Sequence, residues 1–318
     1  MDRTVYLDYA ATTPVDPRVV EVMLPYFTEH FGNPNSLYAL GRDAYRALEG
    51  ARERVAAAIG AVHPNEVLFT SGGTESDNAA LIGIATKASP DGGHVIVSAF
   101  EHHAVLEPAH YLEKHGYEVT YLRPRADGLI NVEDFKAALR DETVIVSILH
   151  GNNELGTVQP IRQIADAAHE VGAFVHTDAA QTLGKLALDV SELGVDAASF
   201  SGHKIYGPKG VGALYLKRRT PFAPHLRGGG QEFRKRSGTQ NVPGAVGFAE
   251  ALRIMLEELP TEAPRLARLR DRILDGVTSS IENTEITAKG DPRLPNIAHL
   301  LVKGVEGGRC CCSSTPRE

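Results

Sequence analysis

The sequence predicts an α/β fold in which a largely parallel β-sheet is covered by helices on both faces. Two observations carry this prediction: short runs rich in β-branched residues alternate with amphipathic stretches, and no internal repeat or Pro/Gly/Ser-rich linker divides the 318-residue chain. Parallel strands need long crossover connections, usually helices, and their burial on both faces makes them continuously apolar. We therefore expect one large α/β domain, followed by the opening of a smaller one.

Six runs predict strands, because each is short, apolar and bounded by turn residues. They are VLFTSGG (67–73), HVIVSAFEH (94–102), TVIVSILHGNNE (143–154), AFVHTDAAQ (173–181), AASFSGHK (197–204) and GALYL (212–216). Amphipathic patterns predict helices over 42–60, 131–141 and 161–172, the last ending at Gly172. From about residue 251 we expect a long helix broken at Pro260 and Pro264, then a strand near NIAHLLV.

The composition favours small-molecule chemistry. The 33 basic and 40 acidic residues give a formal net charge of -7, which offers no general attraction to nucleic acid or to an anionic membrane. No segment reaches the roughly 18 to 20 apolar residues of a membrane span, and the start, MDRTVYLDYAATTP, lacks the pattern of a secretory signal. We therefore expect a cytoplasmic protein without a nucleic-acid or membrane partner.

Polar residues follow five of the predicted strands. Because ligands bind outside the carboxyl ends of the strands in open α/β sheets, these residues should meet at one edge. They are Ser71 to Thr74, Glu101 and His102, Asn152 to Glu154, Asp178 and Gln181, and Ser201 to Lys204.

Each of these residues alone also has an ordinary structural explanation. Residues 72–74 could form a plain turn, yet they lead into a helix whose free N–H groups favour an anion such as phosphate. Asp178 could cap the next helix, yet after an apolar strand it needs a cationic or hydrogen-bonding partner. Lys204 would ordinarily be solvated, yet it follows a buried strand within the glycine-containing segment SGHKIYGPKG.

In combination, these features match one ligand, pyridoxal phosphate. A lysine forms a Schiff base with its aldehyde, an aspartate keeps its pyridine nitrogen protonated, and its phosphate lies at a helix N-terminus. The flat ring of His102 supplies an aromatic neighbour. No metal site is expected.

Eight strings, in order and without large gaps, resemble the cysteine desulfurases of bacterial sulfur and iron–sulfur assembly, which are class V, fold-type I pyridoxal phosphate enzymes. The strings are YLDYAATTPVDPRV, FGNPNS, FTSGGTESDN, EHHAVL, NNELGTVQPI, HTDAAQTLGK, SGHKIYGPKGVG and RSGTQN, and the resemblance ends at about Gly307. It implies a mainly parallel seven-stranded sheet flanked by helices, plus an incomplete small α+β domain. The chain should then comprise an N-terminal segment associated with the small domain (1–15), a large cofactor-binding domain (16–250) and the start of the small domain (251–318).

The resemblance implies roles for individual residues. Lys204 would be the Schiff-base lysine, Asp178 the partner of the pyridine nitrogen, and His102 the histidine that stacks on the ring and moves protons. The phosphate-binding positions would be Gly73, Thr74, Ser201 and His203. Asn153 and Gln181 would lie near the ring hydroxyl and the substrate.

The resemblance also implies partners. Thr239 in RSGT would reach the phosphate of the neighbouring subunit's cofactor, so that a homodimer shares its cofactor sites. The substrate would be L-cysteine, converted to L-alanine, with the sulfur held as a persulfide on an enzyme cysteine and passed to a sulfur-acceptor or scaffold protein.

The end of the chain departs from the family. Where a leucine-rich helix and an SSGSAC-like cysteine loop are expected, the chain reads GRCCCSSTPRE from about residue 308. In another reading frame, the codons of this tail can encode Ala-Leu-Leu-Leu-Leu-Val-Asp-Ala-Ala-Gly, as the family would be expected to continue. The loss of one base from a glutamate codon after Gly307 would shift the frame and produce the tail, so we interpret the tail as an out-of-frame end. We assign no catalytic role to Cys310, Cys311 or Cys312, and turnover lacks its expected nucleophile.

Three other interpretations stay open from the sequence. The chain could be a selenocysteine lyase or another class V lyase, which the nucleophile loop would distinguish. It could be a catalytically silent, cofactor-binding partner of a full-length desulfurase. The three cysteines could instead form a metal or redox site, although adjacent side chains alternate in direction and zinc ligands are usually spaced apart.

Overall fold

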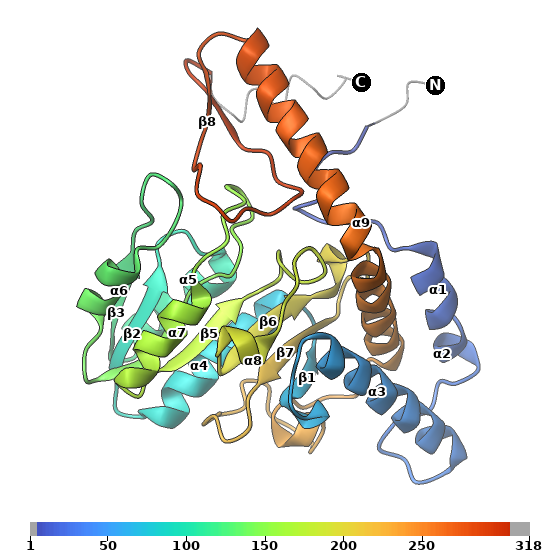
Figure 1. Ribbon diagram of the computed structural model, residues 1–318. Coiled ribbons are helices and arrows are strands. Elements are labelled where there is room, and N and C mark those ends of the chain that lie inside the picture. The colour runs from blue at the N-terminus through green and yellow to red at the C-terminus, as the bar shows by residue number, and fades with distance from the viewer. Residues whose placement is uncertain (1–4, 306–318) are drawn as a thin grey trace.

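The computed structural model describes residues 5–305, which contain a seven-stranded sheet with helices on both faces (Figure 1). The strand order is β1-β7-β6-β5-β4-β2-β3, and β7 runs antiparallel to both of its neighbours whereas the other pairs are parallel. The strands are β1 (Val67–Thr70), β2 (Gly93–Ser98), β3 (Tyr117–Leu122), β4 (Thr143–Ser147), β5 (Phe174–Asp178), β6 (Ala197–Ser201) and β7 (Gly212–Leu216). The predicted α/β class and mainly parallel sheet are confirmed.

All six runs that predicted strands contain one, but β3 was not among them. This strand lies at the edge of the sheet and pairs with β2 alone. Most of its side chains are only partly buried, with Glu118 exposed. An edge strand that meets solvent lacks the continuous apolar run of a central strand, which is why the sequence criterion missed it.

The side chains of the sheet divide between two hydrophobic layers, as the two-residue period of strands requires. On one face, Val95 and Val97 of β2 pack with α4 and α5. On the other face, Ile96 belongs to the layer that α3, α6, α7 and α9 cover. The helices are α1 (Pro17–Met23), α2 (Pro25–Thr28), α3 (Ala39–Ala58), α4 (Gly73–Ala88), α5 (His103–Glu113), α6 (Val132–Ala138), α7 (Ile161–Glu170), α8 (Val190–Leu193) and α9 (Val242–Ser280).

Helix α9 is continuous, so the predicted break at Pro260 and Pro264 is wrong. The two prolines are four residues apart and exposed, and therefore lie on the same solvent-facing side. Carbonyl groups that lose their N–H partner there can bond to water instead. The helix passes the sheet and extends above it (Figure 1). Within the described part of the chain, no helix is both long and apolar enough to cross a membrane.

The chain after α9 forms a two-stranded antiparallel pair, β8 (Thr284–Ile286) and β9 (Leu300–Val302), beside the upper half of α9 (Figure 1). The loop between these strands docks on the main body, where Leu294 N donates to Gly156 O at 2.7 Å and Val158 N donates to Pro292 O at 3.0 Å. The strand expected near NIAHLLV is confirmed. The three-region division of the chain stays a prediction.

Candidate functional site

A cavity of about 800 Å³ lies at the carboxyl ends of β1, β4, β5 and β6. It brings together nine of the ten predicted site residues: Gly73, Thr74, His102, Asn153, Asp178, Gln181, Ser201, His203 and Lys204. Thr239 is exposed in the loop before α9 and is not among the lining residues. The sequence predicts these residues at one edge of the sheet, because the carboxyl ends of parallel strands meet there.

One end of the cavity is suited to an anion. Helix α4 begins there at Gly73. Its N-cap residue is Gly72, at φ +154°, and no side chain in the described part of the chain caps this end. Gly212 packs against this turn so closely that a Cβ atom on it would lie 2.7 Å from Gly72 Cα. Glycines therefore let the backbone turn and leave the first N–H groups of α4 available to a negatively charged group.

Lys204 is held by the N-terminal segment of the chain. Its Nζ atom donates to Ala10 O at 2.7 Å and to Ala11 O at 2.8 Å. Thr13 fixes this segment on the lysine loop, since its N–H and hydroxyl both donate to His203 O. Burial lowers the pKa of Lys204, although the charges of Asp178 and Asp8 oppose that shift. Burial thus favours the neutral amine, which is the nucleophilic form.

Asp178 and His102 lie on the lining of the same cavity. Asp178 ends β5 and accepts a hydrogen bond from Ala180 N at 2.9 Å. Burial raises the pKa of Asp178, and the charges of His102 and Lys204 counteract this rise. His102 Nδ1 accepts from Ala104 N at 3.0 Å, so the neutral ring carries its proton on Nε2.

His203 and Gln181 are also fixed by the N-terminal segment. His203 Nδ1 lies 3.0 Å from Thr12 Oγ1, and burial together with the charge of Lys204 lowers the pKa of His203 to about 4. It is therefore neutral at pH 7. Gln181 Nε2 donates to Ala10 O at 2.9 Å, and Gln181 Oε1 accepts from the buried Lys185 at 3.1 Å.

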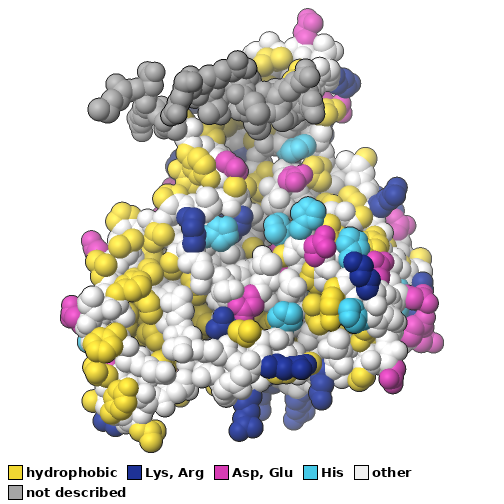
Figure 2. Space-filling model, turned by 180° about the vertical axis from the view of Figure 1, so that it is seen from behind, with side chains coloured by type: hydrophobic (Ala, Val, Ile, Leu, Met, Phe, Trp, Pro, Cys, Tyr) yellow, Lys and Arg dark blue, Asp and Glu magenta, His cyan; other side chains and the backbone are white. Residues whose placement is uncertain are grey.

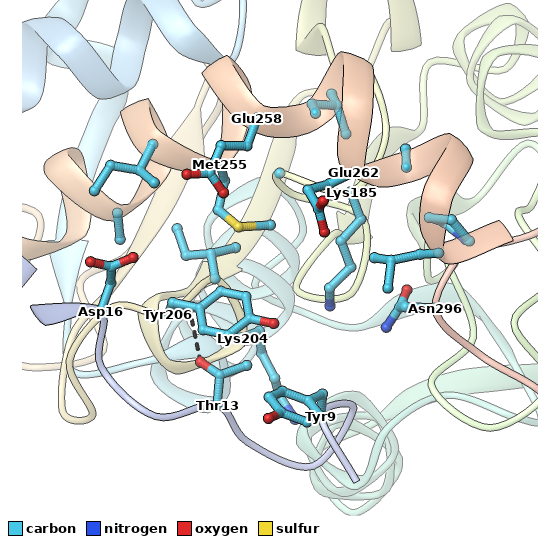
Figure 3. A pocket seen from close by; sticks show the side chains of 18 of the residues that line it. Tyr9, Thr13, Asp16, Lys185, Lys204, Tyr206, Met255, Glu258, Glu262 and Asn296 are labelled. Carbon is cyan, nitrogen blue, oxygen red and sulfur yellow. Dashed lines mark hydrogen bonds between the residues drawn. The ribbon is translucent and has the colours of Figure 1, made fainter. Parts of the chain in front are cut away.

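A second cavity, of about 450 Å³, is drawn in Figure 3 and shares Lys204 with the first. Residues 7–13 separate the two, because Leu7, Tyr9 and Thr13 line the second whereas Asp8, residues 10–11 and Thr12 line the first. Helix α9 covers one side of the second cavity with Met255, Glu258 and Glu262 (Figure 3). Lys204 lines both cavities.

The sequence reasoning missed several contributors to the site. The N-terminal segment was recognised as a motif, but nothing in its composition showed that its carbonyl groups hold Lys204. Asp77 lines the cavity from α4 and was given no role. Its signal was present, because an acidic residue three positions before the buried Ala80 lies on the apolar side of that helix. The three cysteines and the predicted frame change lie outside the described residues.

Comparisons with known proteins point to one family. Residues 5–310 match the family described as aminotransferase class-V. The chain is 46% identical to a protein named cysteine desulfurase IscS from Dictyoglomus turgidum, over 99% of this chain and 84% of that protein.

Solved structures agree. A structure named NIFS-like protein has a TM-score of 0.88 and 40% identity, covering 92% of this chain and 80% of that one. Another, named SspA in complex with cysteine, has a TM-score of 0.76 and 44% identity, covering 79% and 72%.

Proposed function

The chain belongs to the aminotransferase class-V family and, within it, to the cysteine desulfurases; from this premise we propose that it holds pyridoxal phosphate on Lys204 and removes sulfur from L-cysteine. Members of this family are generally dependent on pyridoxal phosphate. The relative solved with cysteine supports this amino acid as the substrate. The observation that carries the proposal is the convergence of Lys204, Asp178 and an uncapped helix N-terminus on one cavity.

The residues that line the cavity fit this cofactor. A cavity of about 800 Å³ lies within the range of small-molecule sites. The N-terminus of α4, with Ser201 and His203, would hold the phosphate, and Asp178 would meet the pyridine nitrogen. His102 would lie against the ring. When bound, the cofactor supplies a carbonyl for imine formation and an electron sink for bond cleavage next to the amino group.

The chain's own side chains supply proton transfer and orientation. Lys204 offers an amine whose pKa burial lowers, which favours its neutral, nucleophilic form. His102 presents an Nε2 proton and, through its Nδ1 bond to Ala104 N, keeps a fixed ring orientation. Gln181 is held with its amide nitrogen toward Ala10, because Lys185 occupies its oxygen. These groups can orient a small amino acid and exchange protons with it without rearrangement of the sheet.

The proposal predicts that Lys204 carries the cofactor. The chain should be purified with pyridoxal phosphate, its visible absorption recorded, the sample reduced with borohydride, and the modified residue located by peptide mass analysis. We expect a stable label on Lys204. Because the chain shows no SSGSAC-like cysteine loop, the added thiol must take the place of the enzyme cysteine as the sulfur acceptor. With L-cysteine and this thiol, the unreduced protein should release L-alanine.

Two outcomes would contradict this assignment. A label on Lys185 or Lys209 in place of Lys204 would overturn the cofactor site. A label on Lys204 without alanine release from L-cysteine would keep the cofactor site but overturn the desulfurase activity, and a parallel sample with L-selenocysteine then tests the lyase interpretation.

We also propose a homodimer that shares its cofactor sites. Exposed apolar side chains gather on α1, α2 and the loop that follows: Val20, Leu24, Phe27, Phe31, Leu37 and Tyr38. Hydrophobic side chains are prominent on this side of the molecule (Figure 2). The same region adjoins the Thr239 loop, because Asn35 Nδ2 donates to Gln240 Oε1 at 3.0 Å. Exposed apolar side chains gathered in one region support a partner subunit beside Thr239.

Sharing of sites predicts complementation between two defective variants. Thr239→Ala should raise the dissociation constant of pyridoxal phosphate about tenfold, because one phosphate hydrogen bond is lost. Mixing it with Lys204→Ala chains should restore tight binding in mixed dimers, where an intact Lys204 faces an intact Thr239. Titration of the mixed sample, after subunit exchange, checks this. If the mixture binds no more tightly than Thr239→Ala alone, the sites are not shared.

Three further assignments stay predictions. They are the cytoplasmic location, the sulfur-acceptor or scaffold partner, and the absence of a role for the three cysteines.

A further inference from the structure

The cofactor cavity contains a second buried aspartate that no step above uses. Asp77 is 1% exposed and lines the same cavity as Asp178, Lys204 and His102. Its Oδ1 atom has no hydrogen-bond partner among the described residues. A buried carboxylate oxygen without a partner is costly and requires an explanation.

The nearest polar groups to Asp77 belong to a row that crosses three central strands. Asp77 Oδ1 lies 3.5 Å from His176 Nε2. His176 on β5 is held between two hydroxyl groups, with Nδ1 2.8 Å from Ser147 Oγ on β4 and Nε2 2.9 Å from Ser199 Oγ on β6. His176 precedes Asp178 by two residues, so the two side chains lie on the same face of the sheet, toward α4.

This row is uncharged. His176 is completely buried, and burial lowers its pKa to about 3. Glu101, the third buried acid here, accepts hydrogen bonds from Ser98 Oγ and Leu149 N, and burial raises its pKa to about 8. No cation among the described residues therefore faces Asp77 from the strands on which α4 packs.

Asp178 has the surroundings that favour a charge, and Asp77 does not. Asp178 accepts a hydrogen bond from Ala180 N, and this bond and the charge of Lys204 both lower its pKa, against the rise that burial causes. Burial, followed by the negative charge of Asp178, raises the pKa of Asp77 well above its usual value, and a hydrogen bond with Ser199 offsets this rise only in part. Two neighbouring buried carboxyl groups do not both ionise, because the second charge would face the first in a low dielectric.

We infer that Asp77 is a positioning residue that keeps its proton, so that Asp178 alone carries the negative charge presented to the cofactor's pyridine nitrogen. The neutral acid fills the space between α4 and the His176 row and can donate its proton to that row. The inference rests on the proposed function for the identity of the cofactor, but the protonation of Asp77 does not depend on it.

Infrared difference spectroscopy on the chain without cofactor tests the protonation directly. The spectrum of the parent minus that of Asp77→Asn should contain the carbonyl stretch of a protonated carboxyl group. The exposed, ion-paired Asp166 provides a matched control, because Asp166→Asn should give no such band. If the Asp77→Asn difference also lacks the band, Asp77 is ionised and the inference fails, whatever the chain does with cysteine.

Cofactor binding tests the positioning role. Asp77→Asn keeps a neutral donor of nearly the same shape, so the dissociation constant of pyridoxal phosphate should stay within about threefold of the parent value. Asp77→Leu removes the polar contact to His176 and Ser199, and should raise that constant about tenfold. Asp178→Asn removes the charge itself and should raise it about a hundredfold.

The pattern across these variants decides the role. If Asp77→Asn binds the cofactor as weakly as Asp178→Asn, Asp77 carries a charge that the cofactor needs, and the inference is wrong. If Asp77→Leu folds and binds like the parent, Asp77 positions nothing. Should Asp77→Leu fail to fold, the infrared band and the Asn variant still decide the question.

Discussion

Replacing Lys204 with alanine is expected to lower alanine release from L-cysteine by at least about 10³-fold, because both the covalent attachment and a proton-transferring amine are lost. The fold should persist. Among residues 5–305 the Lys204 amine bonds only to the backbone oxygens of Ala10 and Ala11, and Thr13 anchors the same segment independently. The side chain is partly buried but forms no ion pair among the described residues.

The measurement is alanine release at saturating L-cysteine with a thiol reductant, alongside the visible absorption of bound cofactor. Lys217→Ala is a suitable control, because this exposed lysine lies outside the cavity and contacts Asp196 at 3.5 Å. It should leave both readouts unchanged. Alanine release by Lys204→Ala within tenfold of the parent would show that another group forms the covalent link.

Replacing Arg52 with methionine should lower the free energy of unfolding by about 3 to 5 kcal/mol, since it leaves a buried carboxylate without its countercharge. Arg52 Nη1 and Nη2 bond to Glu232 at 2.6 and 2.9 Å, and both side chains are essentially inaccessible to solvent. Glu232 also accepts from Phe69 N at 2.9 Å, which ties the loop before α9 to strand β1. The guanidinium lies over the rings of Phe69 and Phe233, at 5.1 and 4.9 Å.

Denaturation in urea measures the change. The double variant Arg52→Met with Glu232→Gln removes both charges and keeps an acceptor for Phe69 N, so it should lose less stability than the single variant. Arg253→Met is the matched control, because Arg253 and Glu257 are exposed and Glu250 only partly buried, so these ion pairs should contribute less than about 1 kcal/mol. A loss as small as that of the control would contradict a structural role for the buried pair.

This buried pair also bears on the shared cofactor site. Glu232, Phe233 and Arg234 have φ values of +45°, +58° and +66°, a conformation that residues other than glycine seldom adopt. The contacts of Glu232 with Arg52 and of Arg236 with Glu75 hold this loop in place. Thr239 follows Arg236 by three residues. We therefore expect Arg52→Met to lower the free energy of unfolding and also to weaken the proposed contact between Thr239 and the partner subunit's cofactor.

Local chemistry made most of the sheet and cavity predictable from the sequence. The buried strands are continuous apolar runs, and each that ends at the cavity is followed by glycine or polar residues. Where packing overrides local preference, the sequence was a poorer guide. The sequence criterion missed edge strand β3, which is only partly buried and so lacks a continuous apolar run. It also predicted a break in α9 at Pro260 and Pro264, where the helix continues because both prolines face solvent. The sequence does not give solvent exposure, which decided both cases.

The sequence by itself determined the α/β class, the edge of the sheet where ligands bind, and nine residues that meet there. Those features follow from periods of a few residues and from motifs whose members are close along the chain. Only the tertiary structure decided that the oxygens of Ala10 and Ala11 hold Lys204, nearly 200 positions away, and that Asp77 on α4 faces His176 on β5. The physical reason is that hydrogen bonds and desolvation act through space, so the state of a buried charge depends on neighbours that are distant in the chain.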